Sequence, residues 1–169
     1  REQMGEGWSD FFALMLTNKP GDNASVPRGM GTYPIGQSIT GGGIRPAKYS
    51  PDFTINDYTY TDTNGMEYNN GSAIVPDVHS IGFVWATMLW DLNWEYVAKY
   101  GYASDVTANT ASGSARVLQL VTDALKLQAC NPTFVDGRNA ILAAELAKTN
   151  GADRCMIWRT FAKRGLGVN

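Results

Sequence analysis

The sequence is poor in the residues that most often carry chemistry. It has one His (His79) and two Cys (Cys130 and Cys155) among 169 residues. These are too few for a self-contained Cys/His zinc site. A Ser-His-Asp or Cys-His site is possible only if His79 supplies the base. Any catalytic chemistry is therefore shared with residues outside this chain, or absent.

Charge is also sparse and nearly balanced. Lys and Arg number 14 and Asp and Glu 16, so the formal net charge is −2 and the pI is about 5.3. A nucleic-acid or anionic-membrane binder carries a basic excess, which is missing here. The sequence also lacks the ~18 to 20 consecutive apolar residues that a membrane span needs. We therefore expect neither nucleic acid nor membrane as a partner.

The residues that are present describe a folded protein. Hydrophobic residues make up 44% of the chain, and Trp, Tyr and Phe 11%, which excludes a disordered tail. The length fits one domain over residues 1–169. The chain enters a helical pattern almost at Arg1, without a leader, so we expect it to be an excised piece of a longer protein.

Apolar residues recur at helical spacing in five segments, so the fold class is expected to be mostly α. The predicted helices are Met4–Leu16, ending near Asn18, then Val78–Tyr100, Ala115–Ala129, Phe134–Lys148 and Asp153–Lys163. The first predicted helix is apolar along one face, and the longest, Val78–Tyr100, is apolar nearly all round. We therefore expect these two helices to pack as neighbours. Residues 77–169 then form a helical bundle with brief connections.

Residues 19–76 differ in character from the rest. Pro and Gly interrupt every regular pattern there, while Tyr and Phe recur between them. Long loops in compact domains are usually functional or linkers. An ordered loop region, with room for short hairpins, is favoured over disorder because the aromatic side chains need a surface to pack on.

Two acids open the first predicted helix. Glu6 and Asp10 are four residues apart and share one helix face. One reading is a solvated polar face, which the helix dipole favours at this end. The other is a metal or catalytic role, indicated by Gly5 and Gly7, which cost a helix ~1 kcal/mol each and are useful where backbones approach closely.

His79 lies where the long loop meets the longest helix. A lone His is more often a capping or core residue than a catalyst. The helix N-terminus lowers a His pKa, while Asp77 opposes that effect. A poised, titrating His79 is the functional alternative.

Four motifs in order resemble a fungalysin-type zinc metallopeptidase, a relative of thermolysin. They are residues 4–11 (MGEGWSDF), 78–87 (VHSIG and VWAT around Phe83), 130–134 (CNPTF) and 155–167 (CMIWRTFAKRGLG). The resemblance covers the chain nearly end to end. It implies the C-terminal helical subdomain of a thermolysin-like metallopeptidase, with residues 1–18 as a ligand-bearing helix and 19–76 as a long Gly/Pro-rich loop insertion.

The resemblance implies a role for each of the polar residues above. In such a site two His ligands and a catalytic Glu come from a His-Glu-x-x-His helix, and a Glu from a second helix is the third zinc ligand. Glu6 matches that third ligand, and Asp10 matches the carboxylate that orients a ligand His. His79 matches the oxyanion donor, and Asp77 its orienting group. The glycines around Glu6 would then let its helix press against the metal-bearing helix.

The His-Glu-x-x-His motif itself is not in this sequence. We therefore expect Zn2+ in the parent protein but not on this chain alone, since one carboxylate cannot hold it. The partners implied are the N-terminal half that carries the zinc helix and a protein or peptide substrate. The isolated chain is expected to be inactive.

Two further pairs of residues are placed by the resemblance. Family members use an Arg to bind the substrate carbonyl, and Arg45 matches that Arg better than Arg28 does. The alternative for Arg45 is an ordinary surface Arg. Cys130 and Cys155, in an exported parent, are implied to form a disulfide, with two buried free thiols as the alternative. No role is assigned to Phe83.

Two classes of function remain. The leading one is the C-terminal part of a secreted zinc endopeptidase that hydrolyses peptide bonds in proteins. The alternative is a non-enzymatic, all-α binding or structural module. A parent sequence with His-Glu-x-x-His shortly before Arg1 supports the enzyme, and its absence supports the module.

Overall fold

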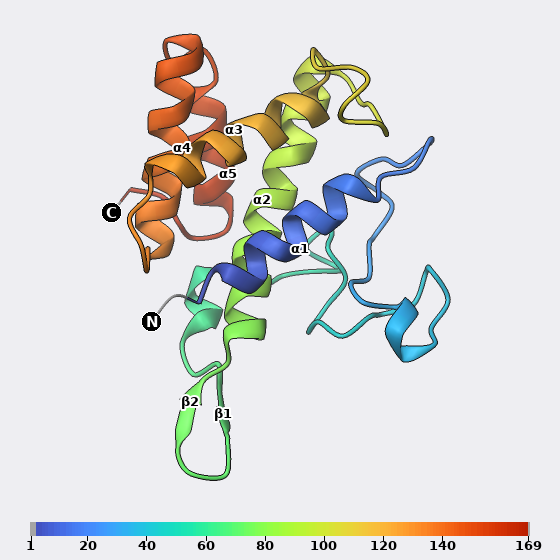
Figure 1. Cartoon of the computed structure of the whole chain (residues 1–169), viewed down its shortest axis with the longest axis vertical. Helices are drawn as coiled ribbons and strands as arrows, with labels where there is room; N and C mark the ends of the chain where they lie inside the picture. The colour runs from blue at the N-terminus through green and yellow to red at the C-terminus, as the bar shows by residue number, and fades with distance from the viewer. Residues whose placement is uncertain (1–2, 169) are drawn as a thin grey trace.

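Helices make up about half of the computed structural model, which describes residues 3–168. The elements in chain order are α1 (Gly5–Leu16), the 3-10 helices η1 (Tyr33–Ile35) and η2 (Tyr60–Thr63), strands β1 (Glu67–Asn69) and β2 (Ile74–Pro76), and helices α2 (Val78–Tyr100), α3 (Gly113–Leu127), α4 (Phe134–Thr149) and α5 (Arg154–Lys163) (Figure 1). The prediction of a mostly α fold is confirmed.

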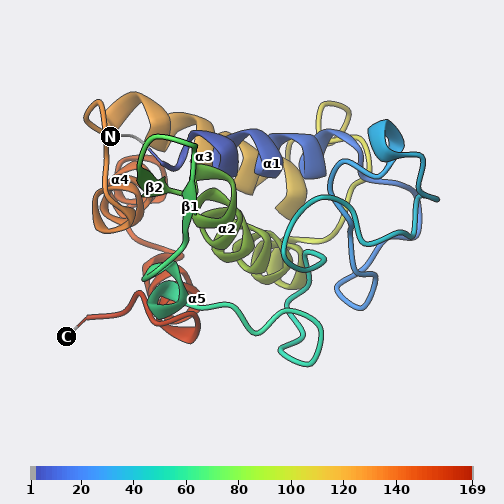
Figure 2. The same cartoon turned by 90° about the horizontal axis from the view of Figure 1, so that it is seen from below.

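Helix α2 is the centre of the fold. It begins after Asp77, whose carboxylate accepts the backbone N–H of His79, and it ends at Gly101, whose φ of 88° no β-carbon tolerates well. The predicted bounds, Val78–Tyr100, match the observed ones. Helices α1, α3 and α5 all pack on α2, with α1 and α3 on one side and α5 on another (Figure 2). This surround explains why α2 is apolar on nearly every face.

Helix α3 begins two residues before its predicted start at Ala115. The Ser112 hydroxyl accepts the N–H of Ala115 and so caps the helix at Gly113. A β-carbon on Gly113 would lie 2.2 Å from the carbonyl oxygen of Tyr96. Only glycine permits this contact between α3 and α2, so a residue of poor helix propensity opens the helix.

The stretch between α1 and α2 is held by hydrogen bonds across long sequence separations. The buried Arg164 guanidinium bonds both oxygens of Asp91 in α2, at 2.8 and 3.1 Å. The same guanidinium donates to the backbone carbonyls of Ser50, Asn56 and Tyr58. These bonds satisfy loop carbonyls that burial would otherwise leave unpaired. The segment after Tyr49 is thereby tied to α2.

None of the helices in residues 3–168 combines the length and apolarity that crossing a bilayer requires.

Candidate functional site

The start of α1 presents Glu6 and Asp10 on one face, as predicted. The Glu6 side chain is 39% exposed, whereas the Asp10 side chain is 6% exposed. Two stacked carboxylates repel each other unless a cation lies beside them. The structure supplies that cation from the long loop.

Arg45 pairs with both acids. Its Nε lies 2.7 Å from Asp10 Oδ2, and its Nη2 lies 2.9 Å from Asp10 Oδ1 and 3.1 Å from Glu6 Oε2. The hydrogen bonds that Arg45 donates to Asp10 raise the pKa of Arg45 above its ordinary value, against the effect of burial. Such a two-pronged guanidinium–carboxylate pair fixes geometry as well as charge. Arg45 therefore fixes the positions of the Glu6 and Asp10 side chains on this face of α1.

His79 meets the same carboxylate from α2. Its Nδ1 lies 3.1 Å from Glu6 Oε2, and its side chain is 60% exposed. Burial acts to raise the pKa of Glu6, but hydrogen bonds from Arg45 and His79 outweigh it, and the pKa lies below its ordinary value. Glu6 is thus an ionised, solvent-accessible carboxylate held between two nitrogen donors.

Asp77 caps α2 instead of touching the imidazole. Its Oδ1 accepts the backbone N–H of His79 at 3.0 Å, and its Oδ2 accepts the Ser80 hydroxyl at 2.5 Å. Burial raises its pKa, while these bonds outweigh it and leave the pKa lowered. Any orienting effect of Asp77 on His79 in this structure acts through the helix start, because its contact is with the backbone.

Tyr49 is a member of this cluster that the sequence analysis missed. Its side chain is fully buried, and its hydroxyl donates to Asp10 Oδ2 at 2.5 Å. Burial and the charge of Asp10 both raise the pKa of Tyr49, so it stays a donor. Phe83 packs on its ring at a centroid distance of 5.1 Å, which explains the buried Phe83. The only sequence signal was its place four residues after Arg45.

Arg28 and Gly7, which the sequence analysis also singled out, both have clear contacts in the structure. Arg28 bonds Asp22 at 3.2 Å and the hydroxyl of Thr17 at 2.7 Å, so it ties the loop to the end of α1 and stands apart from the cluster. Gly7 was expected to face a metal-bearing helix. It faces α2 instead, since a β-carbon on Gly7 would lie 2.3 Å from the carbonyl oxygen of Gly82.

This glycine crossing sets how close Glu6 comes to His79, and it is testable. Because a β-carbon on Gly82 would lie 2.6 Å from the backbone nitrogen of Gly7, we expect Gly82→Ala to destabilise the chain by about 1–3 kcal/mol, the usual cost of overpacking. Urea unfolding measures this. Gly42→Ala is the matched control, since nothing lies within 4 Å of its added carbon. Equal stability of the two variants would contradict the close crossing.

Cys130 and Cys155 are both free and both exposed in this structure. They are therefore not the two buried thiols of the alternative interpretation. The disulfide that the resemblance implies stays a prediction.

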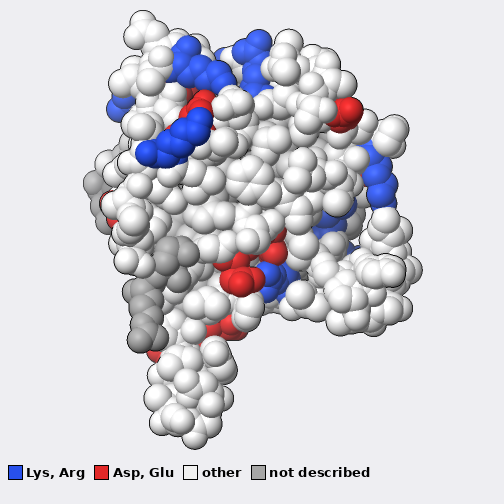
Figure 3. All heavy atoms as spheres, in the orientation of Figure 1, with Lys and Arg blue, Asp and Glu red and all other residues white. Residues whose placement is uncertain are grey.

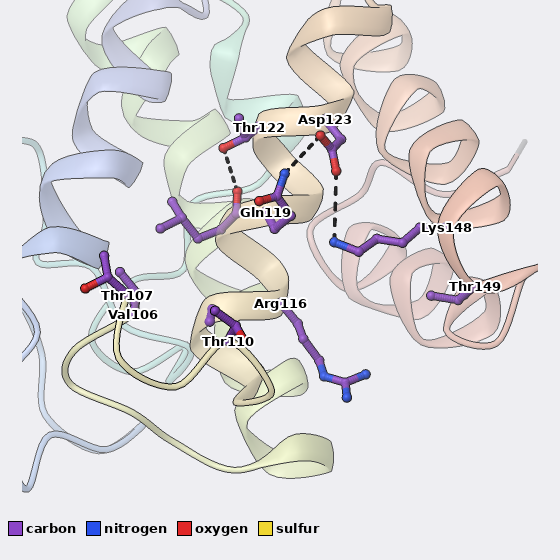
Figure 4. Close-up of a pocket in the computed structure, with 11 residues that line it drawn as sticks. Val106, Thr107, Thr110, Arg116, Gln119, Thr122, Asp123, Lys148 and Thr149 are labelled. Carbon is purple, nitrogen blue, oxygen red and sulfur yellow. Dashed lines mark hydrogen bonds and ion pairs between the residues drawn. The ribbon is translucent and has the colours of Figure 1, made fainter.

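Two hollows in the surface are candidates for a binding site. The larger, of about 750 Å³, lies between the 104–112 loop, α3 and α4 (Figure 4). Its polar groups pair with one another, as in the bond from Gln119 to Asp123 at 3.0 Å and the approach of Lys148 to Asp123. The smaller, of about 370 Å³, is lined by Ile44, Arg45, Pro46, Asp77, His79 and Ser80. At the smaller hollow Arg45 and His79 both contact the partly exposed Glu6 carboxylate, so it is the candidate site.

The cluster of Glu6, Asp10, Arg45 and His79 has too few ligand side chains to hold a metal ion by itself. Within residues 3–168 no group of three or more His, Cys, Asp or Glu side chains is arranged to hold a metal ion. Glu6 nevertheless has the character of one ligand, being ionised and accessible. The chain matches the model of the fungalysin metallopeptidase family (M36) over residues 1–169. The chain belongs to this family.

Fungalysin-family relatives match the chain along nearly its whole length. It is 43% identical to the extracellular metalloproteinase mep of Aspergillus niger, over 97% of this chain, and 41% identical to the extracellular metalloproteinase MEP of Neosartorya fischeri, over 98%. It is 38% identical to the extracellular metalloproteinase 2 of Arthroderma gypseum, again over 98%. The chain spans about a quarter (25%) of the length of each of these relatives.

Proposed function

We propose that this chain is the C-terminal part of an extracellular, zinc-dependent endopeptidase that hydrolyses peptide bonds in proteins. The observation that carries the proposal is that Arg45 and His79, which line one hollow, both contact the Glu6 carboxylate, in a chain of the fungalysin family. The relatives are named extracellular metalloproteinases, which supports the metal and the location.

Glu6 is the residue of this chain that would hold the zinc, as its third protein ligand. Its ionised carboxylate suits the role, and no other ligand set exists in the described residues. The other two protein ligands, both His, come from the N-terminal half of the parent. When bound, the zinc polarises the substrate carbonyl and lowers the pKa of a water molecule. Alone, this chain retains no zinc and is inactive.

Asp10 holds one of those His ligands in orientation. A carboxylate offers about four acceptor positions, and Arg45 Nε, Arg45 Nη2 and the Tyr49 hydroxyl occupy three of them on Asp10. The remaining position accepts the free N–H of the ligand His. Because two buried donors fix Asp10, the imidazole it meets is fixed in turn.

His79 and Arg45 act on the substrate. His79 reaches the hollow from the first turn of α2 and donates its N–H to the oxygen that becomes negative as the carbonyl carbon turns tetrahedral. Arg45 uses Nε and Nη2 on the two acids and also lines the hollow. From there its guanidinium donates to a carbonyl of the bound peptide.

Removal of the metal tests the proposal. We expect the full-length protein to contain stoichiometric zinc and to cleave casein, to lose activity with 1,10-phenanthroline, and to regain it when zinc is added back. This chain expressed alone is the control, and it should hold no zinc and cleave nothing. A full-length protein that binds no metal and cleaves no protein would favour a non-enzymatic module instead.

A further inference from the structure

The two carboxylate oxygens of Asp10 have different numbers of hydrogen-bond donors. Arg45 donates once to each oxygen, from Nε to Oδ2 at 2.7 Å and from Nη2 to Oδ1 at 2.9 Å. The Tyr49 hydroxyl adds a second donor to Oδ2 alone, at 2.5 Å. A carboxylate oxygen accepts about two hydrogen bonds. Donors from residues 3–168 therefore fill Oδ2, and the acceptor position that they leave open is on Oδ1.

The ion pair with Arg45 would by itself leave the two oxygens of Asp10 equivalent. The space-filling view shows acidic and basic atoms meeting in a notch beside the start of α1 (Figure 3). A two-pronged guanidinium occupies one acceptor position on each carboxylate oxygen, so a further donor could approach either of them. The Tyr49 hydroxyl removes this choice because it occupies the second position on Oδ2.

Tyr49 is held so that its hydroxyl has a fixed place. Its backbone N–H donates to the carbonyl of Arg28 at 2.8 Å, and its own carbonyl accepts the N–H of Arg28 at 3.0 Å. Its ring is fully buried and packs on Phe83 of α2 at a centroid distance of 5.1 Å. A side chain fixed by packing also fixes the group to which it is hydrogen-bonded. Tyr49 therefore sets the orientation of Asp10.

Ring packing alone does not account for a hydroxyl at this position. The ring of Tyr58 packs on the same Phe83, at 5.2 Å, and its hydroxyl makes no hydrogen bond within residues 3–168. A Phe at position 49 would fill the same space without burying a polar group, which is costly unless that group is paired. The bond to Asp10 is thus the specific contribution of the Tyr49 hydroxyl.

We propose that Tyr49 is a positioning residue of the zinc site, whose hydroxyl fixes Asp10 so that Oδ1 accepts the N–H of the ligand His. This proposal rests on the proposed function, in which that His comes from the N-terminal half of the parent. Tyr49 contacts neither zinc nor substrate and acts only through Asp10. Its effect is slower loss of zinc, because the groups that orient a metal ligand contribute to metal affinity.

The rate at which zinc leaves the full-length protein tests this role. Zinc-loaded protein is mixed with an excess of the chromogenic chelator 4-(2-pyridylazo)resorcinol, and the transfer of zinc is followed by absorbance. Tyr49→Phe keeps the ring and removes only the hydroxyl. We expect zinc loss to be about tenfold faster, as for other groups that orient metal ligands. Activity should return close to that of the unmutated protein when excess zinc is supplied.

Two other Tyr residues provide matched controls. Tyr58→Phe removes a hydroxyl from a ring that packs on Phe83 beside Tyr49. Tyr102→Phe removes a hydroxyl that donates to the carbonyl of Lys19 at 2.8 Å, beyond the end of α1. It therefore shows what the loss of one hydrogen bond does to the fold. Both variants should release zinc at the rate of the unmutated protein.

A double variant tests whether Tyr49 acts through Asp10. Asp10→Ala combined with Tyr49→Phe should lose zinc no faster than Asp10→Ala alone, because the hydroxyl then has no carboxylate to fix. Additive effects on the rate would overturn the proposal, and so would zinc loss from Tyr49→Phe at the rate of Tyr102→Phe. In both cases the zinc peptidase function stands. An unmutated full-length protein that holds no zinc would overturn that function together with this proposal.

Discussion

Glu6→Gln in the full-length protein is expected to remove most of the zinc and with it the activity. An amide oxygen is neutral and a weaker ligand than a carboxylate, and catalysis by the metal accounts for several kcal/mol of the barrier. We therefore expect kcat/KM to fall by about 1,000-fold or more. Zinc content after dialysis, read by atomic emission, and casein hydrolysis together check the prediction.

The fold should survive this substitution. Glu6 is 39% exposed at its side chain, and Arg45 keeps both bonds to Asp10 when Glu6 is changed. Glu95→Gln is the matched control, because Glu95 is an exposed acid of α2 outside the cluster. Retention of full zinc by Glu6→Gln, with activity equal to that of Glu95→Gln, would show that Glu6 is not a ligand.

Helix positions were predictable because their signals are local. Val78–Tyr100 has its cap, Asp77, and its stop, Gly101, adjacent to the apolar repeat. The start of α3 was misplaced by two residues since Gly113 is a poor helix former, and only its contact with Tyr96 explains its use. The cap, Ser112, was a local signal at that boundary, whereas the glycine after it is explained by tertiary packing.

The site was predictable in part for the same reason. Glu6 and Asp10 share a helix, so their common face follows from spacing alone. Arg45 and Tyr49 join them from 35 to 39 residues away, through a loop whose path depends on the buried Arg164 and on Phe83. The role of Tyr49 was missed because the path of this loop is not visible in the sequence. A Pro- and Gly-rich stretch does not show which of its aromatic rings packs against a helix.

Some expectations concerned contacts that the sequence alone does not show. Gly7 was correctly identified as a point of close approach, and its neighbour in the structure is Gly82 of α2. The disulfide between Cys130 and Cys155 was implied by the resemblance and by an exported parent, and both thiols are free and exposed in this structure.

His79→Ala should separate catalysis from metal binding in the full-length protein. The His79 side chain is 60% exposed, and Glu6 has two contacts, one with His79 and one with Arg45. Loss of the imidazole therefore leaves Glu6 in contact with Arg45 and able to hold zinc. We expect unchanged zinc content and a kcat lower by roughly 100- to 1,000-fold, the cost of losing one oxyanion donor, with little change in KM.

Two further variants serve as controls. His79→Gln, which restores an N–H donor, should recover part of the rate. Ser80→Ala, which removes only a bond to Asp77, should stay close to the unmutated protein. Loss of zinc in His79→Ala would mean that His79 acts by holding Glu6, and unchanged kcat would remove it from the reaction.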